Sequence, residues 1–176
     1  MIYIACRRNL QFSFNFRIFV SNFKFNIMNT YVKSNPRERV FTKKQRTKKN
    51  VQTGDCVIRA IVHATGMDYK TVFNGLLDKS KETMFLPNQK QTYEKFLESH
   101  GWVKRRPMRN DSNKTYEVRH FPAKARGRYI IKTTSHLTAI VNGKHMDSWN
   151  CGEWRANSYY EKAYHFKRSL ITGEGY

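Results

Sequence analysis

The sequence is poor in cysteine. Its 176 residues include only Cys6, Cys56 and Cys151, which are too few and too scattered for a secreted disulfide framework. No two of them have the Cys-x2-Cys spacing typical of a structural zinc site. A domain of this length buries a normal core without such devices, so we expect a reduced, intracellular setting and no metal or other cofactor.

Long apolar runs are also lacking. Basic residues at 7, 8, 17 and 24 interrupt the Phe-rich and Asn-rich stretch 1–27, so no segment approaches the ~20 residues of a membrane span. This stretch has neither the uninterrupted apolar region nor the clear cleavage site of a signal peptide. Two interpretations stay open: the alternation in "FSFNFRIFV" indicates an edge strand, or Met28 is the true start and 1–27 is upstream sequence. We expect no membrane partner.

Acidic residues are scarce. Against 33 Lys and Arg stand 13 Asp and Glu, which gives a formal net charge of +20 and an attraction to polyanions. The basic residues are densest in Arg37–Lys49, within a polar stretch without apolar periodicity. We therefore expect residues 1–50 to form a disordered or extended basic arm that contacts nucleic acid non-specifically. No recognised nucleic-acid-binding motif is present.

Helical spacing of apolar residues comes first along the rest of the chain, and strand patterns follow. It predicts helices from Cys56 to a C-terminal cap at Gly66, and over 68–80 and 88–101. Short β-branched runs predict strands at 128–134, 136–141 and 144–149, with a last strand over 159–167. Asn142-Gly143 is a hairpin turn signal. The sequence therefore predicts an α+β domain over 51–170, with helices first and an antiparallel sheet second, and a tail at 171–176.

Cys56 stands directly before this first helical run, behind a Gly-Asp turn. Unpaired N–H groups and a partial positive charge at a helix N-terminus stabilise a thiolate, and the same N–H groups help to bind an oxyanion. Position and chemistry therefore favour a nucleophile. The alternative is that Cys56 is a small buried apolar residue, which is the common role of a lone cysteine.

A cysteine nucleophile needs a base, and the base needs a group that orients it. His136 opens a predicted strand, and Asp147 lies on the returning strand of the predicted hairpin. Counted out from the turn, Asp147 lies opposite Thr138 and is a diagonal neighbour of His136 on the same face, about 7–8 Å away between backbones. The geometry permits an Asp–His pair. The alternatives are a capping histidine and a turn-forming aspartate.

Other nearby residues have weaker functional interpretations. Asp55 fits an N-cap or turn residue, and His63 lies ~10 Å along the predicted helix, too far to act as the base. Cys151 fits a structural role, since a Cys56–His136–Cys151 metal site lacks a fourth ligand at a recognised spacing. Trp149 either walls the site or plugs the end of the sheet.

The segments "GDCVIRAIVHATG" and "SHLTAIVNGKHMDSWNCG" together resemble the small papain-like cysteine peptidases of phage and bacterial genomes. They are more distantly similar to the bacteriocin-leader peptidases. The resemblance covers about 51–152 and implies a papain-like fold with Cys56 as nucleophile, His136 as base and Asp147 as its orienter. It also implies an oxyanion-binding amide shortly before the cysteine. Gln52 has the better chemistry and Asn50 the better spacing, and we favour Gln52.

These observations predict a cysteine hydrolase with a Cys-His-Asp triad, acting on peptide or isopeptide bonds of a protein or peptide substrate. Amidases and acyltransferases use the same triad. The alternative is a catalytically silent papain-like domain in a basic nucleic-acid-associated protein. Either function fits the cytoplasm, which is the host cytoplasm for a phage-encoded chain.

Overall fold

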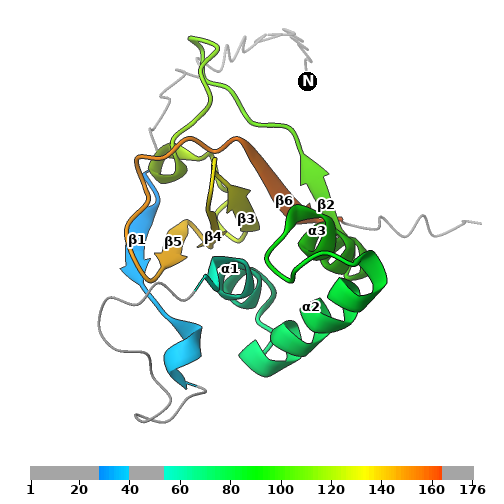
Figure 1. The fold of residues 1–176 in the computed structure, drawn as a ribbon. Coiled ribbons are helices and arrows are strands. Elements are labelled where there is room, and N and C mark those ends of the chain that lie inside the picture. The colour runs from blue at the N-terminus through cyan, green and yellow to red at the C-terminus, as the bar shows by residue number, and fades with distance from the viewer. Residues whose placement is uncertain (1–27, 40–53, 164–176) are drawn as a thin grey trace, which may run out of the picture.

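The computed structural model describes residues 28–39 and 54–163. In these ranges the chain forms three α-helices and one six-stranded sheet, which confirms the predicted α+β class (Figure 1). The helices are α1 (Cys56–Thr65), α2 (Tyr69–Thr83) and α3 (Lys90–Ser99). The strands are β1 (Thr30–Lys33), β2 (Trp102–Arg105), β3 (Arg128–Lys132), β4 (Leu137–Val141), β5 (Lys144–Asp147) and β6 (Ser158–Lys162). Two short 3-10 helices, η1 (Pro36–Arg39) and η2 (Val118–His120), complete the described secondary structure.

The ends of α1 and α2 follow from local sequence. Gly66 adopts φ 79°, a left-handed conformation that glycine reaches without strain, and its N–H donates to the Val62 carbonyl to end α1. The Asp68 side chain accepts hydrogen bonds from the backbone N–H groups of Lys70 and Thr71 and so caps α2. None of the described helices is long and apolar enough to cross a membrane.

The β4–β5 hairpin has the predicted turn and register. Asn142 and Gly143 have φ of 53° and 72°, the left-handed pair that a tight two-residue turn requires. Pairing continues outwards from the turn as counted from the sequence, through Val141–Lys144, Ile140–His145 and Ala139–Met146. The register therefore places His136 and Asp147 at the same end of the hairpin.

The sheet has the strand order β1-β5-β4-β3-β6-β2. Neighbouring strands from β5 to β6 are antiparallel, as predicted. The pair of β6 with β2, a strand that was not predicted, is antiparallel too, but β1 pairs with β5 in parallel. The hairpin strand β4 therefore lies in the interior of the sheet, with β5 on one side and β3 on the other.

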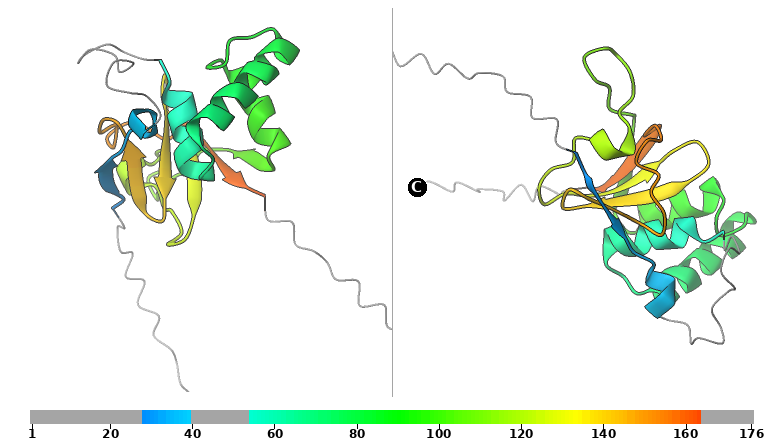
Figure 2. Two further views of the ribbon diagram at one scale, coloured as in Figure 1. Left: turned by 90° about the horizontal axis from the view of Figure 1, so that it is seen from below. Right: turned by 90° about the vertical axis from the view of Figure 1, so that its left-hand side faces the viewer.

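Both faces of the sheet are covered. The three helices pack on one face, and the irregular segment between β2 and β3, with η2, covers the other (Figure 2). Side chains alternate accordingly: Ile130 of β3 belongs to the helix-side core, whereas its neighbours Tyr129 and Ile131 belong to the opposite core. This two-sided burial makes β3 and β4 the most enclosed strands and gives the start of β4 a rigid position.

The predicted arm 1–50 differs from the structure over residues 28–39. There Thr30–Lys33 form an edge strand, and the buried Asn29 side chain donates to the Val118 and Phe121 carbonyls, at 3.2 and 2.8 Å. A four-residue strand in a polar, basic stretch has too little apolar alternation to be recognised from sequence. The predictions for 1–27, for 40–53 with most of Arg37–Lys49, and for the tail 171–176 lie outside the described residues.

Candidate active site

Cys56 is the first residue of α1 and is half-buried where this helix meets the start of β4. Burial raises the pKa of its thiol, but a hydrogen bond from the His136 side chain and others from the Leu137 and Val57 backbone N–H groups outweigh that effect. The resulting pKa lies below the ordinary value for cysteine. Both expected features, the helix end and the neighbouring histidine, therefore favour a thiolate at this position.

His136 lies immediately before β4, on the turn from β3. Its Nε2 donates to Asp147 Oδ2 over 2.7 Å, and the ring also forms a hydrogen bond with the Cys56 side chain. Burial lowers the pKa of His136, yet hydrogen bonds with Asp147, Cys151 and Cys56 raise it overall to about 11. A lowered thiol pKa and a raised imidazole pKa together favour a thiolate–imidazolium pair.

Asp147 ends β5 and is 2% exposed. Burial raises the pKa of its carboxyl, but the His136 hydrogen bond and charge, with the Ser148 backbone N–H at 2.7 Å from Oδ1, hold the pKa below its usual range. The structure thus brings together all three residues of the predicted triad. They are collected from a helix start, a strand start and a strand end that meet at one edge of the core.

No known protein family, curated protein or solved structure matches this chain. The resemblance to papain-like peptidases therefore depends only on the sequence segments that carry it.

A buried network of charged residues lies next to the triad, and it was not predicted from the sequence. Asp55 occupies the N-cap position of α1, as expected, but its side chain makes no capping hydrogen bond. Instead Asp55 accepts from the Arg59 guanidinium and, over 3.0 Å, from the Tyr69 hydroxyl. The other end of the Arg59 guanidinium lies 3.7 Å from Asp147 Oδ1. Arg59 thus connects the residue that precedes the nucleophile with the residue that orients the base.

Cys151 and His145 form a second buried pair beside Asp147. Cys151 Sγ lies 3.3 Å from His145 Nε2 and 3.9 Å from Asp147 Oδ2, and His145 Nε2 lies 2.9 Å from the Thr138 hydroxyl. Burial lowers the pKa of His145 to about 4, so its ring is neutral at pH 7. Cys151 is 1% exposed, in agreement with the structural role expected for it.

One group of possible metal ligands occurs within the described residues. The donor atoms of His136, Asp147 and Cys151 lie within 4.8 Å of one another. Two ligands of one zinc ion, each at ~2.0 Å in tetrahedral geometry, lie ~3.3 Å apart. The 2.7 Å between His136 and Asp147 is shorter and is a direct hydrogen bond. The arrangement therefore fits an oriented base better than a metal centre.

Two tryptophans wall the site. The rings of Trp149 and Trp154 have their centroids 4.9 and 6.2 Å from that of His136, and each side chain is 40% exposed. Of the two interpretations of Trp149, the structure supports a wall beside the histidine. An aromatic cover restricts water at the His136–Asp147 pair and so strengthens the interaction between them.

The remaining predicted residues lie apart from this cluster or outside the described chain. His63 Nε2 lies 3.4 Å from the Ser34 carbonyl, on the side of β1 and η1. Gln52 and its alternative Asn50 lie outside the described residues, so the oxyanion amide stays a prediction.

Proposed function

We propose that this protein is a cysteine hydrolase with a papain-like catalytic fold. The observation that carries the proposal is the continuous line from the Cys56 thiol through the His136 ring to the Asp147 carboxylate, with 2.7 Å between His136 Nε2 and Asp147 Oδ2. Structural cysteines need no such oriented base, and a lowered thiol pKa next to a histidine is typical of nucleophiles. The resemblance of residues 51–152 to papain-like peptidases points to the same residues.

In the reaction, the Cys56 thiolate attacks the carbonyl carbon of an amide, and the protonated His136 gives its proton to the leaving nitrogen. The amine departs and a thioester to Cys56 remains. Neutral His136 then takes a proton from water, the resulting hydroxide attacks the thioester, and the acid product leaves with Cys56 restored. Asp147 keeps the ring oriented and stabilises its positive charge.

Attack by the thiolate places negative charge on the carbonyl oxygen of the substrate. Hydrogen-bond donors at the N-terminus of α1 are needed to stabilise this charge. The Cys56 backbone N–H lies in the first turn of the helix, where such groups have no partner within the helix. We propose Gln52 as the second donor, by analogy with the resembled family. The substrates proposed are peptide or isopeptide bonds in proteins or peptides.

The chemistry suits a reducing compartment, and we propose the cytoplasm. Among the described residues, Cys56 and Cys151 are both free thiols, and a catalytic thiolate loses its function on oxidation.

The test uses the full-length protein and a peptide library with quenched fluorophores. We expect hydrolysis by the wild type and by Cys6→Ser, with a thioester on Cys56 trapped by acid quenching and found by mass spectrometry. Cys56→Ala and His136→Ala should both lose activity by several orders of magnitude. Hydrolysis that survives in Cys56→Ala would refute the proposed nucleophile.

The alternative is a catalytically silent papain-like domain in a nucleic-acid-associated protein. The net charge of +20 favours it, since the charge alone supports salt-dependent binding to a phosphate backbone. Absence of any trapped thioester across the library, together with nanomolar nucleic-acid binding at physiological salt, would favour this alternative over the hydrolase.

A further inference from the structure

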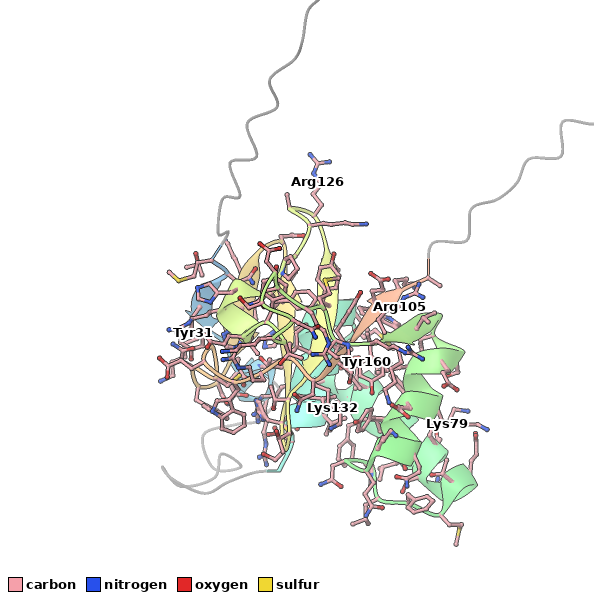
Figure 3. All side chains as sticks on the ribbon, turned by 90° about the horizontal axis from the view of Figure 1, so that it is seen from above. Tyr31, Lys79, Arg105, Arg126, Lys132 and Tyr160 are labelled. Carbon is pink, nitrogen blue, oxygen red and sulfur yellow. The ribbon has the colours of Figure 1, made fainter. Side chains whose placement is uncertain are left out.

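A basic cavity lies beside the candidate active site. It has a volume of about 430 Å³ and opens where β3, β6, β2 and the start of α3 come together. Of the eight residues that line it within the described parts of the chain, five are cationic and none is acidic. The cations are Lys90, Lys104, Arg105, Arg106 and Lys132. Figure 3 labels two of them, Lys132 of β3 and Arg105 of β2, the strands on either side of β6.

The sheet places this cavity next to the nucleophile. Lys132 pairs with Leu137, the residue that follows His136 and whose backbone N–H donates to the Cys56 sulfur. Neighbouring strands are about 4.8 Å apart, so the cavity begins one strand away from the start of β4, which contacts the thiol. Asp147 and Trp149 lie on the other side of β4, where they hold and wall His136. An extended substrate that passes over Cys56 therefore reaches the cavity in the direction of β3.

The charge of the cavity is only partly neutralised. Glu94 lies 2.8 Å from Lys104 and 3.9 Å from Lys90, and Glu161 lies 2.9 Å from Arg105. These two carboxylates offset two of the five positive charges and leave an excess of three. Lys132 Nζ donates to the Thr133 carbonyl, a neutral acceptor. A concave site with this excess attracts an anionic ligand.

We infer that this cavity binds acidic side chains of the substrate, on one side of the bond that is cleaved. The inference rests on the proposed function, because it names the substrate class for the same nucleophile. A peptide carboxylate suits the site better than a nucleic acid, since no aromatic side chain in the lining offers a surface for base stacking. The cavity adjoins a thiol placed to attack an amide carbonyl, which a peptide supplies and a phosphodiester lacks.

The experiment measures binding apart from catalysis. In full-length Cys56→Ala protein, we would measure the anisotropy of a fluorescein-labelled peptide of alternating glutamate and glycine, and of a matched peptide with glutamine for glutamate. The added changes Lys132→Gln and Arg106→Gln should weaken binding of the acidic peptide roughly three- to tenfold, as expected for two partly exposed charges. Binding of the neutral peptide should stay weak and unchanged.

A matched control separates the cavity from total charge. Lys124→Gln with Arg126→Gln removes two positive charges from the loop before β3, and Figure 3 shows Arg126 far from Lys132. Equal weakening by the control and cavity pairs would overturn the inference in favour of non-specific attraction. Loss of binding to a thymidine oligonucleotide, but not to the acidic peptide, in the cavity pair would overturn it in favour of nucleic acid. If the cavity pair weakens peptide binding and no peptide is ever cleaved, the cavity is a binding site for acidic peptides, and its place beside a cleaved bond fails together with the proposed function.

Discussion

Arg59 carries the charged network behind the site, so its removal should damage the fold before it affects any chemistry. We predict that Arg59→Met strongly destabilises the protein. Methionine keeps most of the length and apolar packing of the arginine stem, so the change mainly removes the guanidinium. What remains is the Asp55 carboxylate, 6% exposed, with the Tyr69 hydroxyl still donating to it over 3.0 Å.

The magnitude follows from that burial. Removal of one partner from a buried ion pair costs about 3–5 kcal/mol, because the remaining carboxylate loses that charged partner while it stays out of water. Asp147 also loses the guanidinium at 3.7 Å, a longer contact that adds less. For a chain of this size about 2–4 °C accompany each kcal/mol, so we expect Tm to fall by roughly 6–20 °C.

The assay is urea unfolding followed by fluorescence, with thermal melts in parallel. Arg155→Met is the matched control, since Arg155 is exposed and pairs with Glu117 at 3.4 Å, and it should cost less than about 1 kcal/mol. Asp55→Asn added to Arg59→Met removes the buried Asp55 charge as well and should recover a large part of the loss. A loss below about 1 kcal/mol for Arg59→Met, or no recovery in the double variant, would refute the reasoning.

Three further predictions concern the site itself. Iodoacetamide at mildly acidic pH should label Cys56 before Cys151, because the pKa of Cys56 is lowered and Cys151 is 1% exposed. His136→Ala should move the pH at which Cys56 is half-labelled up towards ~8.5. Mass spectrometry that finds equal labelling of the two cysteines, or an unmoved midpoint pH, would contradict this. On any peptide that the enzyme cleaves, Asp147→Ala should lower kcat/KM less than Cys56→Ala, because Asp147 orients the base and transfers no proton, and an unchanged rate would exclude this role. Burial lowers the pKa of His145 from 6.5 to about 4, so between these pH values the unfolded chain binds a proton at this residue and the folded chain does not. The free energy of unfolding should therefore fall by about 3 kcal/mol as the pH drops from above 6.5 to 4. A His145→Gln variant whose urea midpoint follows wild type throughout this window would contradict the lowered pKa of His145.

The hairpin that carries half of the candidate site could be predicted because its signals are local. The turn at Asn142-Gly143 has a fixed geometry, and a two-residue turn sets the register of the two strands that it joins. Counting outwards from the turn was therefore enough to place His136 and Asp147 together. Cys56 followed from the apolar spacing that marks the start of α1.

The contacts that were not predicted either join segments that are distant in the sequence or bury charged side chains that usually lie on the surface. Asp55 and Arg59 have the spacing of a surface ion pair on a helix, and only the packing of α2 and β5 against this turn makes the pair internal. A signal was present, since an acid and a base four apart at a helix start are placed to interact, but nothing in the sequence marked that face as buried. The Cys151–His145 contact depends on the chain after β5 folding back, which no local pattern specifies.

The parallel strand β1 has a consequence for synthesis at the ribosome. Tyr31 of β1 and Asp147 of β5, joined through the Tyr31 hydroxyl and the Asp147 carbonyl, are 116 residues apart in the chain. At about 5–20 residues per second, β1 waits roughly 6–23 s for the strand that it joins. The same strand delivers Asp147 to His136, so a nascent chain that stops short of β5 lacks both the sheet edge and the oriented base. Formation of this sheet edge and assembly of the candidate triad therefore wait for the same segment of the nascent chain, whereas the sheet is complete only after β6 (Ser158–Lys162) follows.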